Sequence, residues 1–402
     1  MPLASGHRFA LQATLIALAF CLVIKLPTLK YPISNWDELI YWELTKQWLQ
    51  TGEYSLQGNA LLEKLPRSFY DHPAFNHPPG FPALLAPFVL GQSPRFAVVL
   101  SWAGHALAIL AVALVGWELL LASAETVTFR LRCVFFLPLL ALAADPVMNF
   151  IARKIWMDNL LAGASALALV FTWLATRRSS PILPAIAAGL FAALACSLKI
   201  TAAIVLPAMA VVLVFSGRRS WRAAVWTLVP AMVVLLAWMA WFHHQTGSWL
   251  PWWMKPDEAF LRSNPFVAAS VGQSPLFYVW QLLLCCPFAV VLLATSPWQG
   301  WSWRSGVGRM SVLWILLVLA AFTFIGLGGY PKETRYIAPA IPAVYWLFYA
   351  RYQAEDAAAA DRNDRLFVFF LLAAVAGALL SGYYLLIGQY DEIVSPLKLL
   401  GG

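Results

Sequence analysis

Two adjacent carboxylates, Asp37 and Glu38, begin a helix predicted in the long first polar loop of the chain. A carboxylate held beside a substrate can act as a general base that takes a proton from an attacking hydroxyl group. A structural role stays open as an alternative. Ser34 lies three residues before Asp37, as in a capping box, and acidic residues stabilise a first helical turn. An apolar residue recurs at every fourth position, which predicts a helix lying along a membrane interface. These residues are Trp36, Ile40, Leu44 and Trp48.

A second polar loop combines two cations with a carboxylate. Arg153 and Lys154 precede Asp158, so opposite charges lie at the mouth of two apolar runs. Lys199 stands alone between two further apolar runs and is predicted on the same side of the membrane. Cations that are partly shielded from water stabilise negative charge most strongly, so this side of the protein is suited to an anionic substrate.

The last short loop places a glycine pair before two cations. Lys332 and Arg335 follow Gly328-Gly329 and open a helix that contains Tyr336. Helix N-termini and guanidinium groups both bind phosphate, so the segment is a candidate cradle for a phosphate or pyrophosphate. Anchoring of this helix at the membrane interface is the alternative interpretation.

Histidines beside dense prolines end the first loop. Prolines cannot continue a helix, so the backbone around His72 and His77 should form fixed turns that direct the side chains. With Asp71 and the pair His243-His244, these residues are ligand types for a divalent metal ion, although no motif spacing joins them. The alternative is that they are ordinary interfacial residues.

Composition identifies the class of protein. Of 402 residues, 61% are hydrophobic and 11% are charged, against about 45–50% and about 25% in soluble domains. A soluble fold would expose too much apolar surface, so disordered, coiled-coil and disulfide-stapled secreted classes are excluded. The five cysteines all lie in apolar runs and indicate neither a metal site nor a disulfide framework.

We therefore expect an all-α polytopic membrane protein that forms one domain over residues 1–402. A bilayer core of about 30 Å needs about 20 apolar residues per helix. The first outer loop covers about residues 28–93 and carries interfacial helices. Eleven spans are predicted at 9–27, 94–120, 132–147, 158–175, 182–199, 201–216, 223–242, 275–295, 309–328, 336–351 and 366–388.

Basic residues predict the orientation of these spans. The net charge is +8, but the basic residues occur in short groups between apolar runs, which indicates topology and excludes nucleic acid as a partner. With a cytoplasmic N-terminus, the inner loops hold most of them. These are Arg130, Arg132, Arg177, Arg178, Arg218, Arg219, Arg222, Arg304, Arg309, Arg351, Arg362 and Arg365. The short outer loops hold only Arg153, Lys154, Lys199, Lys332 and Arg335. The long first loop then lies outside, at the plasma (inner) membrane.

The order and common sidedness of these motifs resemble the GT-C glycosyltransferases. The similar branch contains the protein O-mannosyltransferases and the lipid A aminoarabinose transferases, and the resemblance runs from the first span to about Pro342. The motifs are Trp36-Asp37-Glu38, His77-Pro78-Pro79, Arg153 to Asp158, Leu198-Lys199-Ile200-Thr201 and Lys332-Glu333-Thr334-Arg335-Tyr336 followed by Pro339.

The resemblance implies a membrane glycosyltransferase that uses a polyprenyl-phosphate-linked sugar on the extracytoplasmic face. It assigns the family's essential first-loop acid to Asp37, with Glu38 as its companion, and the second-loop acid to Asp158. Lys332 and Arg335 take the donor-phosphate role. The further substrate-binding candidates are Tyr336, Arg153, Lys154, His77 and Lys199.

The implied reaction needs a base for the acceptor hydroxyl and cations for the departing phosphate, and a single displacement would invert the anomeric centre. The acceptor is a lipid, a glycan or a protein. No cofactor is indicated beyond the divalent metal ion considered above. The chain departs from the aminoarabinose transferases at His77-Pro78-Pro79, where they carry an acid and a lysine before two prolines. We also expect no outer C-terminal domain, because about a dozen residues follow the last span.

Two other functions remain as alternatives. A flippase or transporter for a lipid-linked sugar or small solute would be favoured by charges at mid-membrane or by an internal repeat. The predicted spans contain almost no carboxylates, and no repeat is found. A structural subunit of an envelope complex is the third hypothesis, and in that case Asp37 is dispensable.

Overall fold

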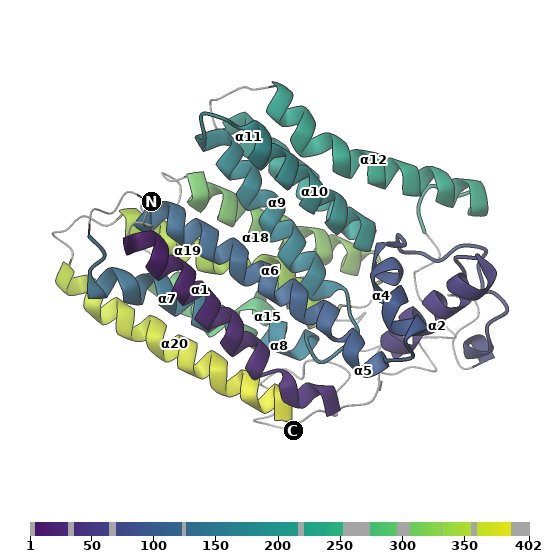
Figure 1. Cartoon of the computed structure of the whole chain (residues 1–402), viewed down its shortest axis with the longest axis horizontal. Coiled ribbons are helices and arrows are strands. Elements are labelled where there is room, and N and C mark those ends of the chain that lie inside the picture. Colours follow the sequence, from purple (N-terminus) through teal and green to yellow (C-terminus); the bar gives the residue numbers. More distant parts are fainter. Residues whose placement is uncertain are drawn as a thin grey trace.

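The computed structural model describes residues 5–30, 36–63, 70–122, 126–215, 221–251, 274–295, 306–330, 332–354 and 360–386. Every regular element in these ranges is a helix. The long helices pack beside one another as a bundle, and the first-loop helices α2 (Trp36–Thr51) and α4 (Gly80–Leu90) lie together at one end of it (Figure 1). The predicted all-α membrane bundle is thereby confirmed.

The predicted spans coincide with helices along the described chain. The remaining elements are α1 (Ser5–Val23), η1 (Leu26–Lys30), η2 (Ala60–Glu63), α5 (Pro94–Ala97), α6 (Val99–Gly116), η3 (Trp117–Leu121), α7 (Phe129–Ala143), α8 (Pro146–Ile151), α9 (Asp158–Arg177), α10 (Ile182–Leu198), η4 (Ile200–Ile204), α11 (Val205–Phe215), α12 (Trp221–Thr246), α15 (Phe277–Cys285), α16 (Pro287–Thr295), α18 (Gly306–Leu327), η6 (Thr334–Ala340), α19 (Ile341–Ala354) and α20 (Ala360–Leu386).

The count of eleven spans is not confirmed. Within the described ranges, six helices are long and apolar enough to cross a membrane, and a bent pair raises the number to seven. The bent pair replaces the straight span predicted at 275–295, because α15 and α16 meet at an angle of 100°. Proline disfavours helical backbone in the residue before it, and Cys286, which precedes Pro287, has φ −123° and ψ 84°.

Helix α2 packs against protein along its apolar face. Ile40 and Leu44 are buried in a cluster that includes Phe81 and Leu85 of α4. This confirms the apolar face that the four-residue spacing predicts. Glu38 on the same helix is also buried. Ser34 and its proposed capping box lie outside the described residues.

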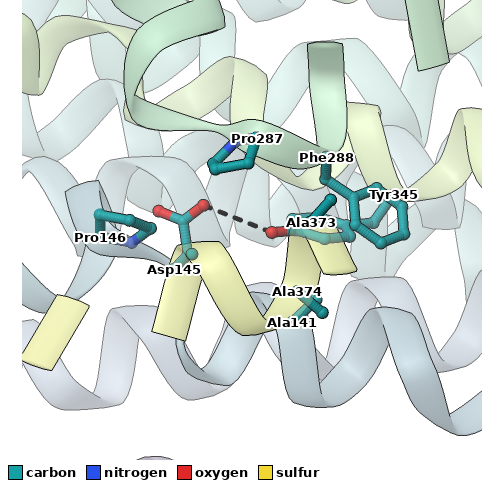
Figure 2. A pocket seen from close by; sticks show the side chains of 9 residues that line it. Ala141, Asp145, Pro146, Pro287, Phe288, Tyr345, Ala373 and Ala374 are labelled. Carbon is teal, nitrogen blue, oxygen red and sulfur yellow. Dashed lines mark hydrogen bonds between the residues drawn. The ribbon is translucent and has the colours of Figure 1, made fainter. Parts of the chain in front are cut away.

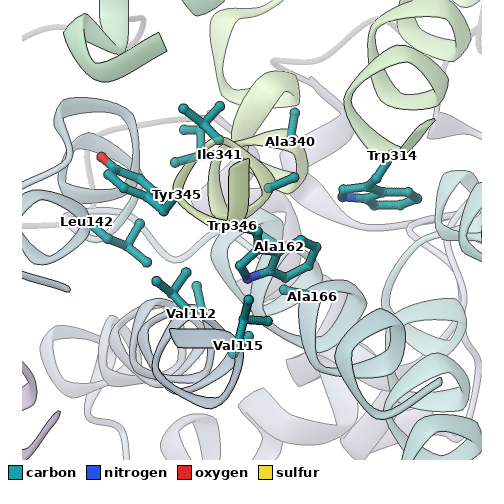
Figure 3. Packing of buried hydrophobic residues seen from close by; sticks show 14 of the residues in the cluster. Val112, Val115, Leu142, Ala162, Ala166, Trp314, Ala340, Ile341, Tyr345 and Trp346 are labelled. Atoms are coloured by element: carbon teal, nitrogen blue, oxygen red, sulfur yellow. The ribbon is translucent and has the colours of Figure 1, made fainter. Parts of the chain in front are cut away.

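Close backbone packing joins α6 to α9 in the middle of the bundle. A Cβ atom on Gly163 would lie 2.3 Å from the carbonyl oxygen of Gly104, and one on Gly104 would lie 2.2 Å from the Asn159 carbonyl carbon. Small residues let membrane helices approach this closely. Around this contact, the indole of Trp346 from α19 lies beside Val115, Ala162 and Ala166 (Figure 3). The packing holds the first residue of α9, Asp158, at a fixed height in the bundle.

We expect Gly163→Ala to destabilise the protein by about 1–3 kcal/mol, because its methyl group overlaps the Gly104 backbone. The melting temperature in detergent measures this loss. Gly382→Ala in α20 is the matched control, since a Cβ there has no atom within 4 Å. Equal melting temperatures for the two variants would contradict backbone contact between α6 and α9.

Candidate active site

The guanidinium of Arg335 lies at the centre of the predicted site. Its side chain is 9% exposed, and Nη2 donates to Asp37 Oδ2 at 2.5 Å. Nη1 lies 4.0 Å from Asp158 Oδ2, and Nε pairs with Glu333 Oε2. Three carboxylates from separate segments therefore surround one buried cation, and two of them are the acids predicted from the sequence.

Helix ends from distant parts of the chain bring these groups together. Asp37 lies in the first turn of α2 and Asp158 is the first residue of α9. Lys199 follows the last residue of α10, and Arg335 lies in the short helix η6. Helix ends leave backbone groups unpaired, so charged side chains are tolerated there more readily than in helix interiors.

Lys199 joins the cluster through Asp158. Its Nζ lies 3.4 Å from Asp158 Oδ1 and 4.4 Å from the centre of the Tyr336 ring. Asp158 thus lies between Lys199 and Arg335 and neutralises part of both charges. The sequence predicted Asp158, Lys199, Arg335 and Tyr336 as site residues, and the structure brings all four together.

An aromatic layer covers the inner side of the guanidinium. The Arg335 Cζ atom lies 4.1 Å from the centre of the Trp156 ring, and Tyr336 stacks on Phe322 with centroids 5.0 Å apart. Rings on this side exclude water and strengthen the charge interactions. Trp156 and Glu333 were not selected from the sequence. In the sequence, only their neighbours point to the site: Trp156 lies close to Arg153-Lys154, and Glu333 lies within the Lys-Glu-Thr-Arg motif.

Glu38 turns away from this cluster, so its predicted role as a catalytic companion of Asp37 has no support in the geometry. Its Oε1 accepts a hydrogen bond from the Ile155 N–H at 2.9 Å, and its Oε2 lies 3.7 Å from Lys154 Nζ. Both charged side chains are 3% exposed. Neighbouring positions on a helix point about 100° apart, which is why Asp37 and Glu38 face different partners. Glu38 fixes α2 to the loop that carries Trp156.

Two other predicted phosphate-binding cations make their described contacts outside the cluster around Arg335. The Lys332 Nζ donates to the Ser274 carbonyl at 3.2 Å, and its aliphatic chain packs directly on Gly326. Arg153 is buried with its guanidinium 5.2 Å from the centre of the Phe150 ring. The described contacts of both residues are with other parts of the bundle.

His77 contributes a neutral ring near the site. Burial, together with the positive charges of Lys199 and Arg335, lowers its pKa to about 3. The ring stacks on Tyr41 at 6.5 Å, and its buried Nδ1 has no hydrogen-bond partner among the described residues. At neutral pH, His77 therefore offers hydrogen-bonding capacity and no charge.

The metal site considered from the sequence finds no matching ligand set. Among the described residues, no group of three or more His, Cys, Asp or Glu side chains could hold a metal ion. His243 instead stacks on Trp249 at 4.3 Å. Beside Asp37, the carboxylate oxygens already face Arg335 and Lys199, and this donor set does not fit a divalent cation.

Asp145 is one of the few carboxylates within the predicted spans, and it is buried inside the bundle. Asp145 lies within the candidate span Phe129–Ile151. Its Oδ1 accepts the N–H groups of Val147 and Met148 and its Oδ2 lies 3.4 Å from the Tyr345 hydroxyl (Figure 2). The adjacent cavity measures about 10 Å³, roughly the minimum for one water molecule. Asp145 therefore caps α8, and the cavity is too small for a sugar.

Solved structures show the same arrangement of helices. No protein-family model and no curated protein sequence matches the chain. ArnT from Cupriavidus metallidurans in the apo state aligns with a TM-score of 0.61 at 13% identity, over 93% of this chain and 75% of that one. ArnT bound to undecaprenyl phosphate aligns with a TM-score of 0.56 at 13% identity and the same coverage.

A second similar protein is the oligosaccharyltransferase AglB from Archaeoglobus fulgidus, in complex with an inhibitory peptide and a dolichol-phosphate. It aligns with a TM-score of 0.55 at 14% identity, over 95% of this chain and 56% of that one. The chain thus spans little more than half the length of AglB. These likenesses establish the fold of the GT-C membrane glycosyltransferases, as the sequence motifs predict.

The buried Glu38–Lys154 pair yields a prediction about the site's framework. Glu38→Gln should destabilise the protein by about 3–5 kcal/mol, because it removes one partner of a buried ion pair. Thermal and denaturant unfolding in detergent would measure the loss. Glu43→Gln on the same helix removes an exposed pair with Lys46 and should cost less than about 1 kcal/mol.

The double variant Glu38→Gln with Lys154→Met should recover much of that stability, since it removes both charges of the pair. If Glu38→Gln were as stable as Glu43→Gln, Glu38 could not be the residue that fixes α2 to the 152–157 loop.

Proposed function

We propose that the protein transfers a sugar from a polyprenyl-phosphate-linked donor to an acceptor on the extracytoplasmic face. One observation carries this proposal. A carboxylate that is 31% exposed, Asp37, meets a guanidinium that is 9% exposed, Arg335, where four segments of the bundle converge. A solvent-accessible base beside a shielded anion-binding cation is what glycosyl transfer from a phosphate leaving group requires.

Arg335 is the group best suited to hold the donor phosphate. A guanidinium binds phosphate through two parallel N–H donors, and the Trp156 and Tyr336 rings shield this one from water. Lys199 adds a second positive charge through Asp158. Two solved structures of similar fold support a polyprenyl-phosphate ligand, because ArnT is described with undecaprenyl phosphate bound and AglB with a dolichol-phosphate.

Asp37 is the base in this proposal. The acceptor oxygen attacks the anomeric carbon, its proton passes to the Asp37 carboxylate, and the bond between that carbon and the phosphate oxygen breaks. The polyprenyl phosphate leaves with the bonding electron pair, which Arg335 stabilises. A single displacement of this kind inverts the anomeric centre. His77, which is neutral, is available to hydrogen-bond a substrate hydroxyl.

The orientation is part of the proposal. The distribution of basic residues supports a cytoplasmic N-terminus in the plasma (inner) membrane. The first-loop helices α2 and α4 lie at the end of the bundle away from the start of α1 (Figure 1). In this orientation, the cluster around Arg335 faces the extracytoplasmic side, where a polyprenyl-linked sugar and its acceptor would meet.

The flippase or transporter alternative would use the charged residues inside the spans, Lys25 and Asp145. Lys25 donates to the Cys21 carbonyl at 2.9 Å, and Asp145 caps α8. With both groups engaged and only about 10 Å³ of space beside Asp145, this region favours a structural role. The cluster at Arg335 remains the better candidate for function.

The test uses detergent-purified protein, a panel of polyprenyl-phosphate sugars and an extract of membrane acceptors, with release of free polyprenyl phosphate as the readout. Asp37→Asn is nearly isosteric but removes the proton acceptor, so we expect a rate loss of about 10²–10⁴-fold. Arg335→Ala should weaken donor use more than Arg335→Lys, because lysine keeps the charge and loses the bidentate fork.

Glu43→Gln, on the same face of the membrane and remote from Arg335, should retain full activity. Each variant must match the wild-type melting temperature before its rate is compared. Wild-type transfer by a well-folded Asp37→Asn protein would contradict Asp37 as the base, and unchanged donor KM and kcat in Arg335→Ala would remove Arg335 from the site.

A further inference from the structure

The side chains that contact Arg335 differ in their exposure to solvent. The Asp158 side chain is 5% exposed and Glu333 is 24% exposed, whereas Asp37 is 31% exposed. Trp156 and Tyr336 cover other parts of the guanidinium. Asp37 is therefore the most open of the groups that contact Arg335, and it occupies Nη2 from the accessible side.

This contact conflicts with the two roles proposed for the pair. Asp37 Oδ2 accepts a 2.5 Å hydrogen bond from the guanidinium, and this contact holds the carboxylate toward Arg335. The donor phosphate needs the same Nη2 atom to form a bidentate contact. Asp37 and a phosphate thus compete for one face of Arg335.

The surroundings make an exchange between them straightforward. Glu333 pairs with Nε, Asp158 lies near Nη1, and the centre of the Trp156 ring lies 4.1 Å from Cζ, so Arg335 stays in place when Asp37 leaves. The buried Glu38 contacts hold the start of α2 to the loop before α9.

We infer that the donor's phosphate displaces Asp37 from Arg335, so that donor binding itself releases the catalytic carboxylate. The inference rests on the proposed function and adds the regulation of its site. Before the donor arrives, Asp37 neutralises Arg335 and is held against it by the hydrogen bond to Nη2. Once a phosphate takes Nη2, the carboxylate turns toward the acceptor side and repulsion by the phosphate keeps it off Arg335. The donor accordingly binds first and the acceptor second.

The exchange predicts that a variant without catalytic activity binds the polyprenyl phosphate more tightly than wild type does. Asp37→Asn no longer competes for the guanidinium with a charge, so it should bind a polyprenyl phosphate about five- to tenfold more tightly than wild type. The probe is undecaprenyl phosphate titrated into detergent-purified protein, followed by calorimetry or thermophoresis. Asp37→Ser is the second variant and should show the same gain.

Two comparisons distinguish displacement of Asp37 from Arg335 from the general effect of removing one negative charge. Glu43→Gln removes a carboxylate elsewhere on α2 and should bind like wild type. The double variant Asp37→Asn with Arg335→Ala should bind no more tightly than Arg335→Ala alone, because the gain requires the guanidinium. Unchanged or weaker binding in both Asp37 variants would overturn the exchange, and so would an equal gain in Glu43→Gln.

These outcomes are distinct from failure of the proposed function. If wild type and Glu43→Gln bind no polyprenyl phosphate at all, the donor assignment fails and the exchange fails with it. If wild type binds the lipid and Asp37→Asn is inactive without binding more tightly, the glycosyltransferase stands and only the exchange is lost.

Discussion

A buried guanidinium can be accommodated only when opposite charges surround it, and the arrangement of this protein's helix ends meets that condition at Arg335. Its side chain is 9% exposed, so an uncompensated charge there would be strongly destabilising. Asp37, Asp158 and Glu333 supply the compensation from three separate segments. The ends of α2, α9 and η6 must therefore meet, and the site depends on that meeting.

The bundle supports this convergence in two ways. Glycines at the crossing of α6 and α9 bring the backbones into contact and fix where α9 begins. The bend between α15 and α16 sets α15 beside the chain around η6, where Gln281 accepts a hydrogen bond from Thr334 at 3.2 Å. A straight helix over 275–295 would not make this turn. The break at Pro287 thus belongs to the framework of the site.

Much of this architecture could be predicted from the sequence, because hydrophobic runs and isolated charges are one-dimensional signals. Helices match the predicted ranges, and Asp37, Asp158, Lys199 and Arg335 were expected on one face. Side-chain direction was not accessible, so Glu38 was grouped with its neighbour Asp37 although the two point to different partners. The helix break at Asp145, which caps α8, was not expected within the span predicted at 132–147, since a helix break within a span leaves little trace in hydropathy. The count of eleven spans is not confirmed, because six helices of the described ranges, or seven with the bent pair, are long and apolar enough to cross a membrane.

The most direct test of the central claim is a structure of the full chain determined with a polyprenyl-phosphate-linked sugar bound, in lipid nanodiscs. We expect the phosphate to lie within hydrogen-bonding distance of Arg335, the anomeric carbon to face Asp37, and the Asp37–Arg335 contact to be broken. A phosphate bound at another place, with the Asp37–Arg335 contact intact, would contradict this expectation.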